Sequence, residues 1–96
     1  MNPALPEMHY VYVLKSCKTK WLYVGCTSDL VRRIKEHNSG KSFTTKKYLP
    51  LNLTYYEAYL SKDDAFLREK KLKSYGSSLQ KLKKRIGNSL KEGLGE

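Results

Sequence analysis

The sequence has 96 residues, and 19 Lys and Arg residues against 9 Asp and Glu residues give a formal net charge of +10. A chain of this length is expected to form one domain. Its hydrophobic fraction of 40% is sufficient for a compact core, so the high charge does not imply disorder. Its two cysteines, Cys17 and Cys26, cannot form a disulfide framework or a four-ligand zinc site. No segment has the roughly 20 apolar residues that cross a bilayer, and residues 1–7 do not form a secretory signal, so we expect a cytoplasmic protein.

The positive charge is concentrated in one part of the chain. Residues 68–85 contain eight Lys and Arg residues and a single acid, Glu69. Basic side chains gain affinity for a polyanion by displacing its counterions, so nucleic acid is the first candidate partner. An anionic membrane surface and an acidic protein are weaker candidates. Solubility alone is the interpretation that needs no partner.

Two segments rich in β-branched and aromatic residues, 9–14 and 21–24, predict the strands of a hairpin. If residues 16–19 form its loop, Tyr12 lies directly opposite Tyr23. Side chains alternate across a strand, so both tyrosines then lie on one, outward-facing side of the hairpin. The other side, which we predict to face the core, carries Val11, Val13, Leu22 and Val24.

Start and stop signals divide the rest of the chain into three helices and one strand. The first predicted helix has a hydroxyl N-cap at 27–29 and stops at 38–40, and a basic loop follows at 41–50. A strand is predicted at 51–59. The second helix opens at 61–64 and ends near Tyr75, and the third opens with a capping box at 77–80. The order ββαβαα predicts a small single-domain α+β sandwich, with a three-stranded antiparallel sheet flanked by helices. We expect a flexible leader at 1–8, the domain at 9–87 and a flexible tail at 88–96.

Several polar and aromatic residues are candidates for chemistry. His37 follows Arg33 by one helical turn, so both lie on one helix face. Glu69 would repel the phosphate that its neighbouring lysines attract, and a divalent cation held between carboxylate and phosphate resolves that conflict. Simpler interpretations exist: the tyrosines pack at the core edge, Arg33 and His37 form a solvated face, and Glu69 pairs with Lys73 for a few tenths of a kcal/mol.

The order of these motifs resembles the GIY-YIG nuclease family. The matching segments are Tyr-Val-Tyr at 10–12, Tyr-Val-Gly at 23–25, the helix at 29–37 and Arg-Glu at 68–69. The chain is most similar to small stand-alone members related to the amino-terminal nuclease domain of the UvrC excinuclease subunit. It departs from the pattern at Tyr10, where the family name has glycine.

The resemblance implies the family's ββαβαα fold and the positions of its site residues. Tyr12 and Tyr23 would line the active site, and one of them would help to activate the attacking water. Gly25 would allow close backbone packing at the end of the second strand. Arg33 would face the scissile phosphate, and Glu69 would bind the metal, Mg²⁺ or Mn²⁺.

Phosphodiester hydrolysis requires a deprotonated water and neutralisation of the charge that grows on the phosphate. A tyrosine has a pKa of about 10, so as a base it needs cationic neighbours that favour the phenolate. Arg33, His37, Mg²⁺ and nearby lysines are expected to provide this charge. The alternative roles for His37, which matches a histidine found in many family members, are a catalytic proton relay and a phosphate ligand.

We expect a monomeric Mg²⁺-dependent endonuclease that nicks DNA with structure-selective or loose specificity, in repair or recombination. Lysines expected to contact the nucleic acid are Lys41, Lys46, Lys47, Lys70, Lys71, Lys73, Lys81 and Lys84. A partner protein is the alternative source of targeting, and no membrane partner is expected. The alternative functions are a non-catalytic nucleic-acid-binding module with the same fold and an RNA- or ribosome-associated protein.

Overall fold

The computed structural model describes residues 5–74 and 76–92. Residues 1–4 of the predicted leader, Tyr75 and residues 93–96 of the predicted tail lie outside the described residues. The elements are β1 (His9–Ser16), β2 (Leu22–Thr27), α1 (Leu30–Asn38), a short 3₁₀ helix η1 (Lys46–Tyr48), β3 (Leu51–Tyr59), α2 (Lys62–Lys73), α3 (Ser77–Arg85) and α4 (Gly87–Glu92). Within the described ranges, no helix has both the length and the apolarity needed to cross a membrane.

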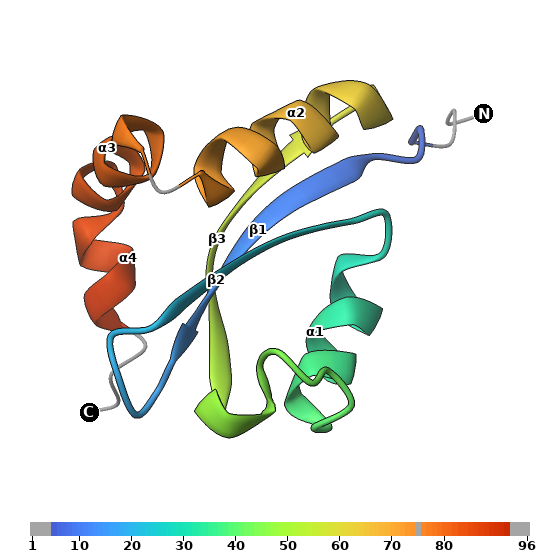
Figure 1. The fold of residues 1–96 in the computed structure, drawn as a ribbon. Coiled ribbons are helices and arrows are strands. Elements are labelled where there is room, and N and C mark those ends of the chain that lie inside the picture. The colour runs from blue at the N-terminus through green and yellow to red at the C-terminus, as the bar shows by residue number, and fades with distance from the viewer. Residues whose placement is uncertain (1–4, 75, 93–96) are drawn as a thin grey trace.

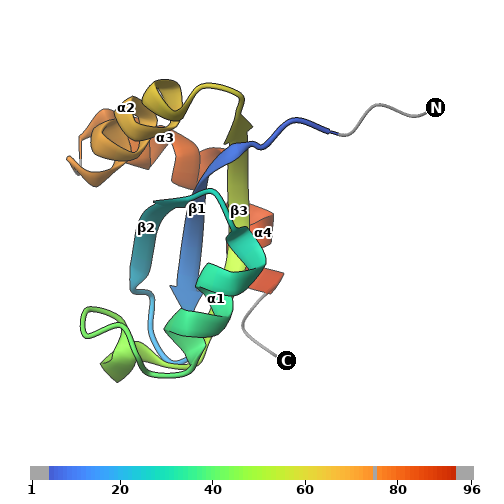
Figure 2. The same cartoon turned by 90° about the vertical axis from the view of Figure 1, so that its right-hand side faces the viewer.

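The strands form one antiparallel sheet in the order β2-β1-β3, so β1 is central and β2 is an edge strand. Helices α2, α3 and α4 lie on one side of the sheet, and α1 and the segment containing η1 lie on the other (Figures 1 and 2). This arrangement confirms the predicted α+β sandwich with a three-stranded antiparallel sheet flanked by helices. Side chains from helices on both faces of the sheet can therefore reach the exposed edge of β2.

The register of the hairpin differs from the prediction by two residues. Tyr12 pairs with Gly25 instead of Tyr23, and Tyr23 pairs with Leu14. A shift of one residue would have moved one tyrosine to the other face, whereas a shift of two leaves every side chain on its predicted face. Tyr12 and Tyr23 therefore lie on the same side of the sheet, displaced along it.

The shift arises because Ser16 belongs to β1 and not to the loop. Its backbone N–H donates to the carbonyl of Trp21 at 3.0 Å and so continues the ladder by one residue. Its Oγ accepts hydrogen bonds from the backbone N–H groups of Lys18 and Thr19, which closes the turn. The loop therefore occupies residues 17–20.

Both faces of the central strand β1 are buried from residue 11 to residue 16. The predicted core side is confirmed, because Val11, Val13 and Val24 pack against Leu72 of α2 and further apolar residues of α3. The prediction that the tyrosine face points outward is wrong. Tyr12 is 1% exposed and belongs to a second apolar cluster, against which Leu30 and Ile34 of α1 pack.

The helix starts follow the predicted positions with different caps. Asp29 caps α1, because its carboxylate accepts from the backbone N–H of Arg32 at 3.2 Å, so the predicted hydroxyl cap is wrong. Ser61 caps α2 as predicted, through the backbone N–H of Asp64. The predicted capping box of α3 does not form, because α3 begins directly after Gly76 without a side-chain cap.

The segment predicted as the start of a flexible tail is helical as far as the structure describes it. Residues 87–92 form α4, whose backbone continues from α3 through a hydrogen bond from the Leu90 N–H to the Ile86 carbonyl. Leu90 also packs against the core cluster beneath α2 and α3. Burial of this apolar side chain offsets the conformational freedom of the nearby glycines.

Glu57 of β3 determines how α2 is oriented on the sheet. Its carboxylate accepts two hydrogen bonds of 2.9 Å from the Arg68 guanidinium and further ones from the hydroxyls of Tyr55 and Tyr59. Burial raises the pKa of Glu57, but these hydrogen bonds outweigh it and hold the pKa below its ordinary value. With Arg68 directed towards β3, the next residue, Glu69, lies towards β2, where it shares a pocket with Cys26.

Candidate active site

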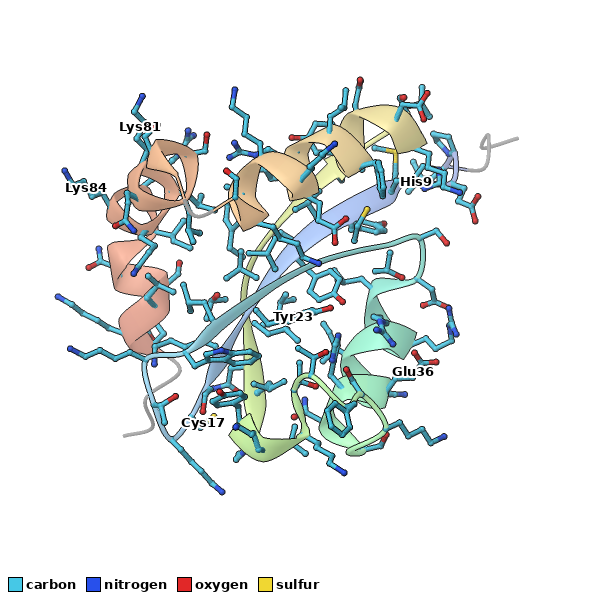
Figure 3. All side chains as sticks on the ribbon, in the orientation of Figure 1. His9, Cys17, Tyr23, Glu36, Lys81 and Lys84 are labelled. Carbon is cyan, nitrogen blue, oxygen red and sulfur yellow. The ribbon has the colours of Figure 1, made fainter. Side chains whose placement is uncertain are left out.

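The predicted catalytic residues meet at the β2 edge of the sheet. Arg33 and His37 come from α1 on one side, and Glu69 comes from α2 on the other. Tyr12 of β1 and Tyr23 of β2 lie between them, with ring centroids 6.3 Å apart. In Figure 3, Tyr23 lies on the α1 side of β2. The structure thus brings together five residues that are up to 57 positions apart in the chain.

Tyr12 reaches this edge by lying across Gly25. A Cβ atom on Gly25 would be 2.3 Å from the Tyr12 hydroxyl oxygen, so only glycine leaves room for the ring. The close packing expected at Gly25 is therefore present, but a side chain and not backbone makes the approach. The glycine accommodates a side chain from the neighbouring strand and so allows the Tyr12 hydroxyl to reach the site.

A chain of three buried polar side chains begins at Tyr12. Its hydroxyl lies 2.9 Å from His37 Nε2, and His37 Nδ1 lies 3.0 Å from Oγ1 of Thr45. His37 and Thr45 are both 0% exposed. Since both ring nitrogens are engaged inside the protein, His37 is not placed to bind a phosphate, which excludes its expected role as a phosphate ligand.

The partner of Thr45 favours one tautomer of His37. The Thr45 hydroxyl lies 3.5 Å from the Ser42 carbonyl, which can only accept. A hydroxyl donating there accepts the Nδ1–H of His37, which leaves Nε2 as the acceptor for the Tyr12 hydroxyl. Burial, followed by the charge of Arg33, lowers the pKa of His37 and keeps the ring neutral at pH 7. The expectation that His37 adds positive charge beside the tyrosines is therefore wrong.

Tyr12 is a neutral phenol in this environment. Burial and then the neighbouring Tyr23 raise its pKa to about 12, although a hydrogen bond from the Arg33 guanidinium acts in the opposite direction. The expectation that cationic neighbours favour the phenolate is therefore wrong for the protein alone, because desolvation outweighs the nearby charge. Tyr12 is poised to exchange protons with His37 instead.

Arg33 is held at the site by Glu36. Its Nη1 lies 3.0 Å from Glu36 Oε1, and its side chain is about one-third exposed. Glu36 raises the pKa of Arg33, and its own pKa is lowered by the same hydrogen bond. The guanidinium is thus fixed between Glu36 and the Tyr12 hydroxyl, with part of its surface open to an incoming anion.

Glu69 approaches the tyrosines from α2. Its carboxylate forms the expected i,i+4 ion pair with Lys73 at 3.1 Å, and its side chain is only 15% exposed. The Lys73 ammonium also lies 5.4 Å from the centre of the Tyr23 ring. The charge of Glu69 reaches Tyr12 and raises the pKa of that residue, so the carboxylate belongs to the same electrostatic cluster.

The predicted nucleic-acid-binding lysines are all exposed, but they lie on different surfaces. Of these eight, Lys73 is the one whose described contacts include the site. Lys46 and Lys47 lie over the rings of Phe43 and Tyr48 on the loop before β3. Lys81 and Lys84 extend from α3 away from Tyr23 (Figure 3). Lys41 lies near Glu36, and Lys70 and Lys71 lie on the exposed side of α2.

Sequence reasoning missed Thr45 and the positioning role of Glu36. Thr45 lies in a basic, hydroxyl-rich loop in which nothing separates it from its neighbour Thr44 except its burial. Glu36 follows Arg33 by three residues, a spacing that predicts a surface ion pair and could have indicated the contact. The partner of His37 was not accessible from spacing, because it depends on how the loop folds back over α1.

Replacing Gly25 by alanine should disrupt the site from within. The new Cβ would displace the Tyr12 ring, and we expect a loss of about 1–3 kcal/mol in the free energy of unfolding, as overpacking of a core typically costs. Urea denaturation measures this loss. Gly87→Ala is the matched control, since a Cβ there meets nothing within 4 Å, and it should change stability by less than about 0.5 kcal/mol. Equal stabilities of the two variants would contradict the close contact.

The buried His37 should make the fold sensitive to mild acid. Its folded-state pKa is lowered, so below about pH 6.5 the unfolded chain binds a proton that the native state does not. Stability should therefore fall with pH by up to about 1.4 kcal/mol per unit in this window. Glu36 and Glu57, whose pKa values are also lowered, act later, as the pH falls through 4.5.

Urea unfolding at about pH 7.5 and about pH 5.5 tests this dependence. The wild-type protein should be less stable at the lower pH, and His37→Gln should lose most of the difference. A wild-type free energy of unfolding that is the same at both pH values would show that His37 is not held neutral by the fold.

Comparison with known proteins assigns this arrangement to a class. Residues 8–84 match the family model described as the GIY-YIG catalytic domain, and the chain therefore belongs to the GIY-YIG family. This confirms the resemblance seen in the motifs, and membership supports a nuclease-type function.

The chain is similar to proteins named UPF0213. One from Staphylococcus haemolyticus is 45% identical over 76 residues, which cover 78% of this chain and 90% of the relative. One from Haloquadratum walsbyi is 37% identical over 70 residues, 72% of this chain and 78% of the relative. The solution NMR structure of a UPF0213 protein from Bacillus halodurans is 37% identical, covers 78% of this chain and 80% of its own, and superposes with a TM-score of 0.49.

Proposed function

We propose that the protein is a Mg²⁺- or Mn²⁺-dependent endonuclease that hydrolyses phosphodiester bonds in DNA. The observation that carries this proposal is the Tyr12–His37–Thr45 chain, which ends at the same sheet edge as Arg33 and Glu69. A proton acceptor, a guanidinium and a carboxylate around one point are the groups that phosphodiester hydrolysis needs.

The proton path follows from the protonation states. Tyr12 is a phenol with a pKa raised to about 12, and it lies next to a neutral His37 whose Nε2 is free to take a proton. As the Tyr12 oxygen accepts a proton from the attacking water, its own proton moves to His37 Nε2. Thr45 accepts from Nδ1–H throughout and holds the ring in the orientation that this transfer requires.

Arg33 provides the positive charge that does not depend on a metal. Its partly exposed guanidinium can donate to a non-bridging phosphate oxygen while Glu36 keeps its plane fixed. A donor positioned in this way stabilises the charge that grows on the phosphate during attack. Glu36 is thus a positioning residue, whereas Arg33 contacts the substrate directly.

Glu69 fits a metal that is shared with the substrate. Among the described residues, no three His, Cys, Asp or Glu side chains are grouped so that they could hold an ion by themselves. Mg²⁺ commonly keeps several waters and binds through one or two carboxylates together with substrate phosphates. A single, mostly buried carboxylate at the edge of the sheet, such as Glu69, matches this mode of binding. The chemistry that the ion supplies when bound is charge neutralisation at a phosphate oxygen and at the departing 3′ oxygen.

A panel of DNA substrates tests the proposal. Supercoiled, branched, flapped and single-stranded DNA should be incubated with the protein in Mg²⁺, in Mn²⁺ and in EDTA. We expect nicking or cleavage of at least one substrate with either metal and none in EDTA. Binding without cleavage of any substrate would contradict the catalytic proposal and favour the non-catalytic binding module, and the same panel in RNA would reveal a preference for ribose.

A further inference from the structure

A groove continues the candidate site along the β2 edge. It has a volume of about 490 Å³ and lies between β2, the loop before β3, α2 and α3. This volume is in the range of about 300–1,000 Å³ that is typical of ligand-binding clefts. Tyr23 and Lys73 line the groove and also belong to the candidate site, so a ligand in the groove would be adjacent to the reacting phosphate.

The groove has an aromatic wall. Trp21 lines it and is backed by Tyr48, whose ring is stacked on the indole with centroids 3.9 Å apart and planes inclined by 9°. Tyr48 itself does not line the groove, so it holds the indole from behind. A rigid, partly exposed indole is a surface on which a nucleobase can stack whatever its sequence.

The rim of the groove is positively charged. Lys20, Lys73 and Lys83 line it, and no Asp or Glu does. In the part of the chain that the structure describes, neither Lys20 nor Lys83 forms an ion pair with a carboxylate. Their charge is therefore available to a ligand that carries phosphate.

Apolar side chains form the rest of the wall and indicate which kind of nucleic acid fits. Leu72 and Leu79, which belong to the core cluster on the other face of the sheet, also line the groove. The bases of a duplex are stacked on each other and paired, so a duplex would present its phosphates and base edges but no free base face for stacking. An unpaired nucleotide presents both a base for the aromatic and apolar wall and phosphates for the lysines.

We propose that this groove binds an unpaired nucleotide stacked on Trp21, next to the scissile phosphate. The proposal rests on the proposed nuclease function and deepens it, because it selects substrates with single-stranded character beside the cleavage point. Lys83, which was not among the lysines predicted to bind nucleic acid, contacts the backbone of this segment.

Trp21 is the single tryptophan of the chain, so its fluorescence reports on the groove directly. The protein should be titrated in EDTA with short oligothymidylate and with a blunt-ended, fully paired duplex of equal length. We expect oligothymidylate to quench the emission and to protect Trp21 from acrylamide, and the duplex to change neither. Equal quenching by the two ligands, or binding of oligothymidylate with unchanged emission, would overturn the proposal.

Variants identify the two contacts separately. Trp21→Leu should weaken binding of labelled oligothymidylate, measured by anisotropy, by about tenfold, whereas Trp21→Phe should retain most of the affinity because a ring remains for stacking. Lys83→Gln should make the dependence of log affinity on log salt less steep by about 0.7. If the two proteins bind equally at about 1 M salt, this corresponds to about eightfold weaker binding by the variant at about 50 mM salt. Lys35→Gln is the matched control at an exposed lysine of α1 that does not line the groove, and it should leave the slope unchanged.

The outcomes separate this proposal from the nuclease function. All binding measurements are made without metal, so they do not depend on cleavage. Quenching by oligothymidylate in a protein that cleaves no DNA would support the groove and contradict the nuclease. Metal-dependent cleavage with unchanged Trp21 fluorescence would support the nuclease function and contradict nucleotide binding in the groove.

Discussion

Glu69→Gln is expected to reduce the metal-dependent cleavage rate by about 10³-fold, which corresponds to about 4 kcal/mol of lost transition-state stabilisation. The amide keeps the size of the side chain but removes the charge that would hold the cation. Affinity for DNA in EDTA should be unchanged or slightly higher, because a negative charge has been removed from a basic surface. This combination of lost turnover and retained binding distinguishes a metal ligand from a general binding residue.

Asp63→Asn is the control for Glu69→Gln. Asp63 is an exposed acid in the first turn of the same helix, α2, so the two substitutions remove the same charge from one element. The control should keep the wild-type cleavage rate. Steady-state cleavage at several Mg²⁺ concentrations measures both variants, and a Glu69→Gln rate equal to that of the wild type would remove Glu69 from the site.

The sequence predicted the architecture because local signals agreed with one another. The period-two pattern at 9–14 and 21–24 assigned each hairpin side chain to its correct face even though the register was wrong by two residues. The register depended on hydrogen bonds of Ser16, a residue that suits a strand end and a turn equally well. The start of α3 was placed correctly for the wrong reason, because Gly76 and not a serine side chain precedes it.

The sequence was more informative about which residues to choose as candidates than about their protonation states and hydrogen-bond partners. Residue types and the resemblance to the GIY-YIG family selected Tyr12, His37 and Glu69 as candidates, and the structure places them at the same edge of the sheet. Protonation depends on burial, which spacing does not report, so the pKa of Tyr12 was expected to shift in the wrong direction. The partner that orients His37 lies in an irregular loop, and only the folded chain shows that Thr45 is the residue it meets.

Tyr12→Phe is expected to reduce the cleavage rate by about 10²–10⁴-fold, the range associated with loss of a positioned acid–base group. The ring remains in its buried position over Gly25, so the fold should persist. His37 Nε2 loses its partner, which should cost about 1–3 kcal/mol in the free energy of unfolding. Tyr56→Phe, at an exposed tyrosine of β3, is the control and should retain full activity.

The pH dependence of the wild-type rate distinguishes two roles for Tyr12. If the phenolate were the base, a pKa of about 12 would make the rate rise about tenfold per pH unit throughout the neutral range. If Tyr12 relays the proton to His37, the limiting requirement is a neutral imidazole, whose pKa is lowered. The rate should then reach a plateau at and above about pH 7 and decline only in acid. Single-turnover cleavage between about pH 5.5 and about pH 9 measures this profile, and a continuous tenfold rise per unit would contradict the relay.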